Sequence, residues 1–357
     1  MQQKKALVIL SPGFAENEAD STCLPAQQQF INALNEQFPS VKLVILAFQY
    51  PFSNKNYQWN GAWVIPFNGK NKGKLYRFLL WIRVWNELNR LKKQYQLIGL
   101  FSFWFGECAL IGKWFSKRNQ FKHFTWVLGQ DAGPGNKYVK WLRPLPDELV
   151  AMSDFLSKAF EKNYGIRPAY MIPNGIDPRI FSEQVPERDI DILGVGSLIP
   201  LKRYDLFIDI IKELKKQIPF IKAVLCGEGS ERMRLALMIA EAGLQESVLL
   251  MGEQSHSAVL QVMQRSKVLL HPSSYEGFSG ACLEALYAGA HVISFCNPKD
   301  AWVRHWHIVD DKDNMIQQAL EILLTPDIEH KPVLAYTMNH TAKSIMELFD
   351  HIETAIS

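Results

Sequence analysis

The sequence predicts an α/β fold with two doubly wound domains in tandem. Short apolar runs alternate with amphipathic segments of ten or more residues, the pattern of βαβ units with parallel strands. The alternation stops in Tyr170–Asp189, a proline-rich stretch with an Asn-Gly turn, and then restarts. A chain of 357 residues also exceeds what one hydrophobic core usually serves. We expect one domain over residues 1–185, a second over 186–335, and a C-terminal helix at 336–357 that packs back toward the first.

The first half carries six apolar runs that are expected to form strands, with amphipathic segments between them. The run from Ala6 to Leu10 is too short for the core of a signal peptide and is assigned to the first strand. The expected strands are 4–10, 41–48, 97–102, 123–128, 148–151 and 168–172. The expected helices are 22–37, 72–94, 106–118 and 153–164.

The second half repeats the same alternation. Pro272 ends one strand, Ser279 is placed at the cap of the following helix, and Gly289 lies just past its end. The expected strands are 189–196, 221–226, 247–251, 267–271 and 290–295. The expected helices are 203–217, 230–242, 256–265, 279–288 and 312–324.

Composition and charge limit the classes of protein that fit. No apolar run approaches the roughly 20 residues needed to cross a bilayer. The five cysteines are scattered and form no CxxC pair, which argues against a disulfide framework or a zinc site and favours a reducing, cytoplasmic setting. Residues 1–175 hold 22 Lys and Arg against 11 Asp and Glu, whereas the remainder is acidic. A basic half fits an acidic or lipid partner or merely solvated lysines, and both interpretations stay open.

Ligands of doubly wound sheets bind at the carboxyl ends of the strands, and the loops at those positions in the second half are unusual. In "GVGSLIPLKRYD", Gly194 and Gly196 precede Lys202 and Arg203, a combination that suits a phosphate group. In "CGEGSER", Gly227 and Gly229 again precede a helix, although an ordinary tight turn would look the same.

The third loop, "HPSSYEGFSGACLEALYAG", carries Glu276 before a helix and Glu284 within it. A glutamate in an apolar helical run is costly to bury unless it is paired. A pair of ligand hydroxyls is one suitable partner, and a salt bridge to a Lys or Arg is the other. The amides of Gly277, Phe278 and Ser279 would point from the helix start toward a bound anion.

Taken together, in their order and spacing, these three loops resemble the retaining glycosyltransferases of the GT-B fold, family 4. The resemblance is looser in the first half, where it rests on "VLGQDAG", "AMSDFLSKAFEKNYGI" and "IPNGID". It implies two Rossmann-like domains that face a central cleft, an acceptor-binding domain first and a domain for the nucleotide-sugar donor second. It also implies transfer with retention of configuration, without a metal or other cofactor.

The resemblance assigns roles to individual residues. Glu284 would bind the ribose hydroxyls and Glu276 the donor sugar near the reacting carbon. Lys202 would hold the diphosphate, and the amides of Gly277, Phe278 and Ser279 would contact the sugar and phosphates. The other expected donor-binding residues are Gly13, Gly196, Ser197, Arg203, Gly227 and Gly229.

The sequence also departs from the family pattern. Ser197 stands where an arginine is often found, and Arg203 is the expected substitute. A histidine of the first domain is missing, and Asp131 is the nearest ionisable replacement, with turn capping as its alternative role. Glu276, Lys202 and Asp131 are therefore the expected catalytic residues.

The segment 69–95 carries eight Lys and Arg against one acid, Glu87, with Phe78, Trp81, Ile82 and Trp85 at helical spacing. Two interpretations stay open: a core-packing helix with solvated cations, or a helix that contacts a membrane surface. No recognised nucleic-acid-binding module accompanies the basic residues, so nucleic acid is not expected as a partner.

The expected function is therefore the transfer of a sugar from a nucleotide-sugar donor to a glycan or lipid-linked acceptor, in the cytoplasm or at the inner face of the membrane. A nucleotide-sugar epimerase of the same fold is one alternative. A degenerate protein that binds nucleotide sugars without catalysis is the other.

Overall fold

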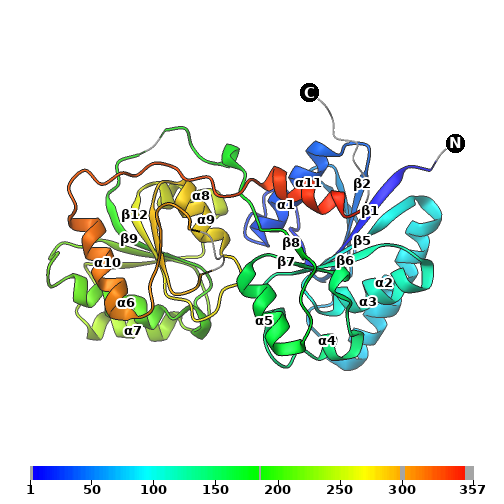
Figure 1. Cartoon of the computed structure of the whole chain (residues 1–357), viewed down its shortest axis with the longest axis horizontal. Helices are drawn as coiled ribbons and strands as arrows, with labels where there is room; N and C mark the ends of the chain where they lie inside the picture. Colours follow the sequence, from blue (N-terminus) through cyan, green and yellow to red (C-terminus); the bar gives the residue numbers. More distant parts are fainter. Residues whose placement is uncertain (1–2, 185, 298–301, 350–357) are drawn as a thin grey trace. The chain divides into compact units, whose positions relative to one another are not determined.

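The computed structural model describes residues 3–184, 186–297 and 302–349 of the chain. It divides them into two compact units (Figure 1). Unit 1 comprises residues up to Gly175 together with the segment from Thr337, and unit 2 comprises Ile176–Tyr336. The boundary between the units lies at Gly175 in the structure, whereas the sequence predicts it at residue 185. The chain passes from unit 1 to unit 2 directly after Gly175.

Unit 1 is built on an eight-stranded sheet of order β3-β4-β2-β1-β5-β6-β7-β8. Its strands are parallel except for the pair β3–β4, which forms an antiparallel hairpin. The strands are β1 (Lys5–Gly13), β2 (Lys42–Tyr50), β3 (Tyr57–Trp59), β4 (Ala62–Pro66), β5 (Gln96–Phe103), β6 (His123–Val127), β7 (Leu149–Ala151) and β8 (Tyr170–Met171). The helices are α1 (Pro25–Gln37), α2 (Lys74–Gln94), α3 (Glu107–Asn119), α4 (Lys137–Leu142), α5 (Asp154–Tyr164) and α11 (Met338–Glu347).

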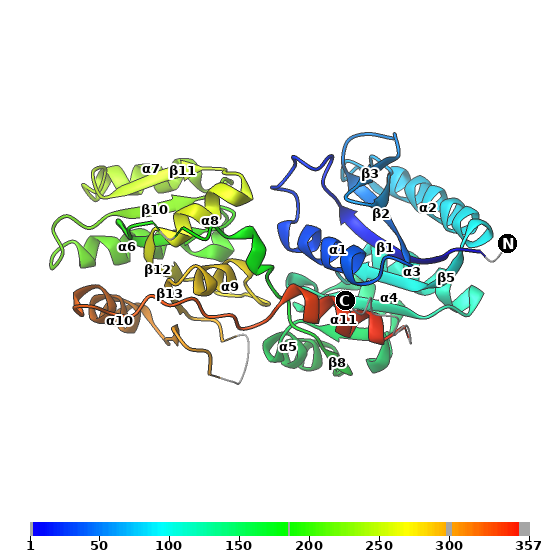
Figure 2. The same cartoon turned by 90° about the horizontal axis from the view of Figure 1, so that it is seen from above.

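The alternation of side chains along β1 and β2 explains why both faces of this sheet are covered. Ala6, Val8 and Leu10 join the core under α2 and α3. On the opposite face, Phe30 of α1 packs against Phe101, with ring centroids 5.9 Å apart. Figure 2 shows α11 beside α1, and these two helices share extensive contacts.

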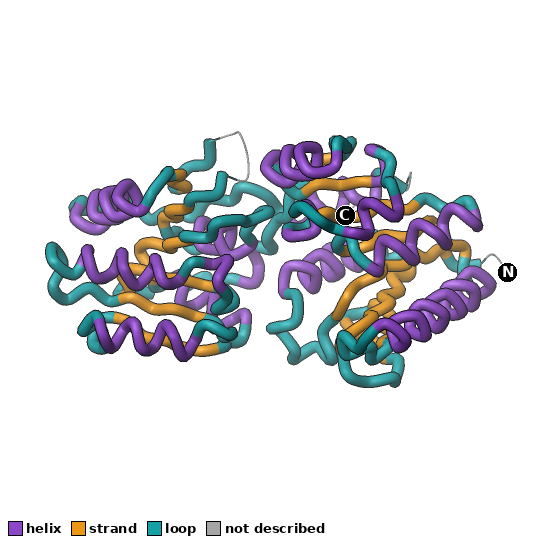
Figure 3. Tube along the Cα trace, turned by 90° about the horizontal axis from the view of Figure 1, so that it is seen from below, coloured by secondary structure: helices purple, strands orange, loops and turns teal. Residues whose placement is uncertain are grey.

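Unit 2 has a six-stranded, fully parallel sheet of order β11-β10-β9-β12-β13-β14. The strands are β9 (Ile190–Val195), β10 (Ala223–Cys226), β11 (Val248–Gly252), β12 (Ser266–His271), β13 (His291–Ser294) and β14 (Trp306–Ile308). The helices are α6 (Tyr204–Leu214), α7 (Arg232–Glu241), α8 (His256–Gln264), α9 (Gly280–Tyr287) and α10 (Lys312–Leu324). Helices α6, α7 and α10 share one core against the sheet, while α8 and α9 cover the other face (Figure 3).

The strand order of unit 2 is that of the dinucleotide-binding fold, in which the order reverses once. The reversal lies between β9 and β12, which pair directly. Loops that leave two neighbouring strands in opposite directions open a crevice at the carboxyl edge, where ligands of such sheets bind. The loops after β9 and β12 are therefore the first place to look for a site.

The structure adds four elements that the sequence does not predict. The β3–β4 hairpin turns on Asn60 and Gly61, both with positive φ, which is the Asn-Gly signal of a two-residue turn. Helix α4 and strand β14 are short, with six and three residues, so neither carries a clear periodicity. The C-terminal helix is shorter than expected within the described residues, and the part of 336–357 after Phe349 lies outside them.

The segment expected as a basic amphipathic helix is α2. The four apolar residues noted in its sequence, Phe78, Trp81, Ile82 and Trp85, do not share one face. Leu80, Val84, Leu88 and Leu91 form the buried stripe. Trp81 and Trp85 pack at the edge of the same core, whereas Phe78 and Ile82 are exposed. The core-packing interpretation therefore holds for the tryptophans and is wrong for Phe78 and Ile82.

His123 opens β6 and is buried in the core of unit 1. Its Nε2 lies 2.8 Å from Oγ of Ser102 on the neighbouring strand. A methyl group at Gly112 of α3 would come within 2.4 Å of the same atom, so the ring fills the space that this glycine leaves. Burial, with a smaller effect of Lys113, lowers the pKa of His123 to about 3.

We expect the free energy of unfolding to fall as the pH drops below 6.5. The unfolded chain then takes up a proton on His123 that the folded chain excludes down to about pH 3. The loss amounts to about 1.4 kcal/mol per pH unit for this group. Urea unfolding at pH 7.5 and 5 should therefore differ less in His123→Gln than in the wild type. The exposed His340 gives the control, because His340→Gln should keep the wild-type difference.

Candidate functional site

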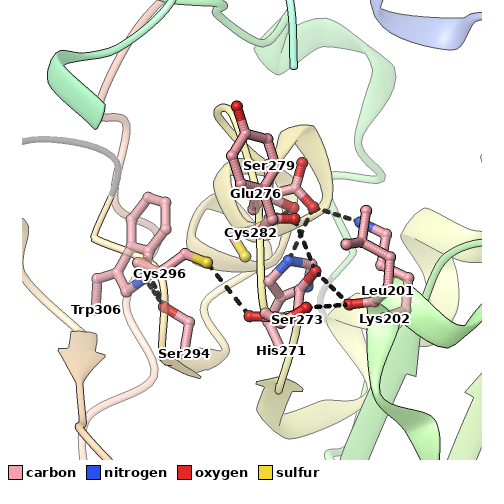
Figure 4. A network of polar contacts seen from close by, with 12 residues as sticks. Leu201, Lys202, His271, Ser273, Glu276, Ser279, Cys282, Ser294, Cys296 and Trp306 are labelled. Carbon is pink, nitrogen blue, oxygen red and sulfur yellow. Dashed lines mark hydrogen bonds and ion pairs between the residues drawn. The ribbon is translucent and has the colours of Figure 1, made fainter. Parts of the chain in front are cut away.

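The loops that follow β9 and β12 meet through direct hydrogen bonds (Figure 4). The amide of Ser274 donates to the carbonyl oxygen of Leu201 at 3.1 Å, and Oγ of Ser273 donates to the same oxygen at 3.2 Å. These contacts join the segment that carries Lys202 to the segment that carries Glu276. Both segments therefore lie at the strand-order reversal.

The glycines of the first two loops pack against each other, backbone to backbone. A Cβ at Gly227 would lie 2.0 Å from the carbonyl oxygen of Gly196, and one at Gly229 would lie 2.4 Å from that of Leu198. The three glycines, at 196, 227 and 229, also have positive φ between 143° and 158°. A side chain at Gly227 or Gly229 would force the loops apart, and one at Gly196 would be strained by the positive φ. The glycines are therefore required by loop packing, and their contact with a ligand stays a prediction.

Lys202, Glu276 and His271 form one charged cluster at the carboxyl edge of the sheet (Figure 4). Nζ of Lys202 is bonded to Oε2 of Glu276. Nε2 of His271, the last residue of β12, lies 3.1 Å from the same carboxylate oxygen. The Lys202 and Glu276 side chains are each about a fifth exposed, so both can reach a ligand.

The cluster keeps Glu276 ionised. Burial alone would raise the pKa of this carboxyl, but the hydrogen bond with His271 and the ammonium of Lys202 outweigh it and bring the pKa to about 2. Burial lowers the pKa of His271, which favours the neutral ring that donates from Nε2. The result is a fixed carboxylate between a neutral donor and a cation.

Helix α9 begins directly after this cluster. Oγ of Ser279 accepts from the amide of Cys282 at 3.3 Å and caps the helix, as expected. Phe278 is buried, and its ring lies 5.6 Å from that of Tyr336 and 6.3 Å from that of Trp306. The Phe278 side chain therefore anchors the loop, and the binding of a ligand by its backbone amide stays a prediction.

Glu284 lies in the second turn of α9 and is paired with a histidine. Its Oε1 is 2.7 Å from Nε2 of His256 in the first turn of α8. Burial of His256 opposes its charge, but the hydrogen bond with Glu284 and the carboxylate charge raise its pKa overall. The partner found among the described residues is thus a histidine, where the sequence suggests a lysine or an arginine as the alternative to a ligand.

The residues that replace the expected arginine lie at the surface. Ser197 is exposed, and so is Arg203, which adopts a left-handed conformation with φ of 54°. Nε of Arg203 lies 3.7 Å from Oδ1 of Asp205. A role of Ser197 or Arg203 in binding a diphosphate stays a prediction.

In unit 1, Asp131 joins the ends of β5 and β6. Its carboxylate accepts from the amides of Phe105 and Gly129, both at 2.7 Å, and of Leu128 at 3.2 Å. Burial raises the pKa of Asp131, and the amide bonds partly offset this rise. This is the turn-capping geometry, and the catalytic role of Asp131 stays a prediction. Gly13 ends β1, where the amide of Phe14 donates to the carbonyl oxygen of Tyr50.

The sequence does not predict two of the histidines at the site. His271 occupies the last position of a strand whose end is correctly expected, so its closeness to Glu276 follows from the turn at Pro272. His256 follows Ser255, the cap of α8, but nothing local indicates that it faces α9. The pairing of α8 with α9 cannot be read from sequence distance alone.

Comparison with known proteins places this geometry in a family. The model of the Glycosyl transferases group 1 matches residues 176–302, and that of the Glycosyltransferase Family 4 matches residues 29–180. Together they span both units and include the loops described above.

The sequence identity between this chain and individual relatives is low. The chain is 27% identical over 230 residues to one of the subunits of the phosphatidylinositol N-acetylglucosaminyltransferase of Arabidopsis thaliana, a match that covers 60% of this chain and 52% of the relative. It is 27% identical over 235 residues to the N-acetylgalactosamine-N,N'-diacetylbacillosaminyl-diphospho-undecaprenol 4-alpha-N-acetylgalactosaminyltransferase of Campylobacter jejuni, covering 62% and 61% of the two chains. The chain thus spans less than two thirds of the length of either relative.

Solved structures agree on the fold. The HepE protein of Anabaena, crystallised with UDP and glucose, has a TM-score of 0.67 at 15% identity, with 98% of this chain and 100% of that chain covered. A glycosyltransferase from Rickettsia africae has a TM-score of 0.69 at 11% identity, with 97% and 98% covered. The expected GT-B fold is confirmed, and the chain belongs to the glycosyl transferases of group 1, family 4.

Proposed function

We propose that the chain transfers a sugar from a nucleotide-sugar donor to an acceptor hydroxyl, with retention of configuration. The observation that carries this proposal is the cluster of Lys202, Glu276 and His271 at the strand-order reversal of unit 2. A cation, a carboxylate held ionised and a helix start are gathered where a nucleotide would lie. The family membership and the crystallisation of HepE with UDP and glucose support the same donor class.

The chemistry required of these residues is modest. The diphosphate of a nucleotide sugar already leaves readily, so the site has to stabilise the charge that develops on it. Lys202 supplies a positive charge, and the amides of Gly277, Phe278 and Ser279 lie at the start of α9. To reach a phosphate, Lys202 has to exchange its bond with Glu276 for one with the ligand. The released carboxylate oxygen can then accept from a hydroxyl of the donor sugar.

Glu284 is assigned to the ribose. One carboxylate can accept from two neighbouring hydroxyls, and its Oε1 is held by His256 at 2.7 Å. The histidine fixes the orientation of the carboxylate, so the ribose meets an acceptor whose geometry is already set. His256 is therefore a positioning residue in this proposal.

We propose a glycan or lipid-linked acceptor, on the carboxyl edge of the unit-1 sheet. The Arabidopsis and Campylobacter relatives are named for a phosphatidylinositol and a diphospho-undecaprenol acceptor, which supports the lipid-linked class. A cytoplasmic location at the inner face of the membrane and independence of metal ions stay predictions. The second is tested by activity in the presence of EDTA.

The donor class is tested by thermal shift against UDP, GDP and ADP, followed by incubation with the matching nucleotide sugars alone. We expect one nucleotide to raise the melting temperature, because a ligand that binds the folded state stabilises it. The donor alone should be hydrolysed slowly at most. Conversion of the donor to an epimer would establish the epimerase instead, and tight binding without transfer to any acceptor would establish a degenerate binding protein.

Substitution of the two glutamates should separate binding from turnover. We expect Glu284→Ala to weaken nucleotide binding by about 10- to 150-fold, the range for a lost hydrogen bond to a charged group. Glu276→Ala should mainly lower kcat. Calorimetry and steady-state kinetics measure the two effects, with the exposed Glu246→Ala as a matched control. Unchanged nucleotide affinity in Glu284→Ala would contradict the ribose assignment.

His271 should act through Glu276 and not through packing alone. His271→Ala removes the hydrogen bond and should lower kcat by about tenfold or more, with a smaller change in the KM for the donor. His271→Gln keeps a donor group and should restore most of the activity. If the Gln variant folds but is as impaired as the Ala variant, the hydrogen bond at 3.1 Å is not what matters.

A further inference from the structure

The first turns of α2 expose large apolar side chains on the surface of unit 1. Over residues 75–82 the sequence is "LYRFLLWI", in which Arg77 is the one charged residue. The exposed fractions are 73% for Leu75, 60% for Tyr76, 57% for Phe78, 51% for Leu79 and 42% for Ile82. We call these five residues the α2 patch. Exposed apolar groups that lie together in this way usually mark an interaction site.

Folding of unit 1 does not account for the α2 patch. The helix already buries Leu80, Val84, Leu88 and Leu91 against the sheet. The outward positions of its second half are polar, with Asn86, Arg90 and Lys93 exposed. The same helix therefore changes from an apolar to a polar outer face along its length, and the apolar part is not explained by its core contacts.

An ion pair beside the patch joins α2 to α3. Nε of Arg77 lies 2.6 Å from Oε1 of Glu107, the first residue of α3, and α3 in turn contacts α4. Trp141 of α4 is 59% exposed, and its ring lies 5.6 Å from that of Tyr138. An exposed tryptophan thus lies on α4, and both α4 and α2 contact α3.

Cations surround these apolar groups. Nζ of Lys72 lies 4.8 Å from the ring of Tyr76, and Nζ of Lys137 lies 5.4 Å from the ring of Trp141. Lys70 lies over the exposed ring of Phe52 at 5.3 Å. Within the described ranges, Lys70, Lys72 and Lys137 form no ion pair with a carboxylate. Their charge is available to an anionic partner.

We propose that the α2 patch docks on a membrane surface that carries anionic headgroups. Apolar and aromatic side chains would enter the headgroup boundary while the flanking lysines contact phosphates, the arrangement of an interfacial helix. A second copy of the chain fits less well as the partner. A symmetric contact through this patch would place the same lysines of the two copies close together, and their like charges would repel. This docking does not depend on the sugar-transfer activity, although a lipid-linked acceptor would lie in the same surface.

The position of the patch connects it to the proposed site of unit 1. Helices of βαβ units start at the carboxyl edge of the sheet, and α2 starts there between β4 and β5. The docked surface and the edge where the acceptor is expected therefore adjoin each other. A lipid-linked acceptor would reach this edge without leaving the bilayer surface.

The test is flotation of the full chain with vesicles of phosphatidylcholine alone and with vesicles of phosphatidylcholine mixed with anionic phosphatidylglycerol. We expect binding to the anionic vesicles that weakens with salt, and little binding to the neutral ones. Leu75→Ser/Phe78→Ser/Leu79→Ser should lower the partition coefficient by about 100-fold or more. Lys70→Glu/Lys72→Glu should lower it by about tenfold or more.

The matched control lies in unit 2, where Phe220, Met233 and Leu237 are 90%, 75% and 61% exposed. Their triple Ser variant should bind vesicles like the wild type. The proposal is overturned if the wild type ignores anionic vesicles at low salt, if either α2 variant binds unchanged, or if the control loses binding equally. A dimer in light scattering that the α2 variant abolishes, without vesicle binding, would assign the patch to a second copy. Nucleotide binding, measured in parallel, keeps these outcomes separate from failure of the proposed activity.

Discussion

The contact between Lys202 and Glu276 is the constraint on which the proposed site of unit 2 depends. A carboxylate that is four-fifths covered is unfavourable unless opposite charge and hydrogen bonds compensate for lost water. Here the ammonium and the ring of His271 provide both, and the pKa of Glu276 falls to about 2 in spite of its burial. The acid is therefore ionised at neutral pH. A site that receives a neutral sugar beside an anionic diphosphate needs both signs of charge close together.

The loops have to come close for this contact to form, and the glycines allow it. Gly227 and Gly229 lie against carbonyl groups of the first loop, which leaves no room for a Cβ. The amide of Leu198 then donates to the carbonyl oxygen of Glu228 at 2.8 Å, and the loop continues into the turn that carries Lys202. The strand order places the third loop next to the first. Topology, glycine packing and the ion pair thus depend on one another, and a change in any one would displace the charges.

Local signals in the sequence determine much of this fold. The long strands and helices of both units can be predicted because apolar periodicity, caps and turn residues agree over ten or more residues. Short elements cannot be predicted in this way, because too few residues show a periodicity. Helix α4 has six residues, and strand β14 has three at the edge of its sheet. The Asn60-Gly61 turn is a usable signal for the β3–β4 hairpin. The outer face of α2 differs from expectation because spacing alone cannot tell which of two apolar stripes the core will take.

The sequence proposes residues for the site, but it does not predict their contacts. Motif order identifies Lys202, Glu276 and Glu284, yet their partners His271 and His256 come from segments whose proximity only the folded sheet creates. For Asp131, the sequence suggests a catalytic role, but the carboxylate accepts from three backbone amides, which is the geometry of a turn cap. Sequence identifies the groups, and tertiary packing decides whether they face a ligand or the backbone.

The most direct test is a crystal structure of the chain with a bound nucleoside diphosphate. We expect Nζ of Lys202 to have left Glu276 and to lie within about 3.2 Å of a phosphate oxygen, a normal hydrogen-bond distance. The ribose hydroxyls should lie on the carboxylate of Glu284. A nucleotide bound at the loops of unit 2 with Lys202 still paired to Glu276, or a nucleotide bound elsewhere, would contradict the role given to this ion pair.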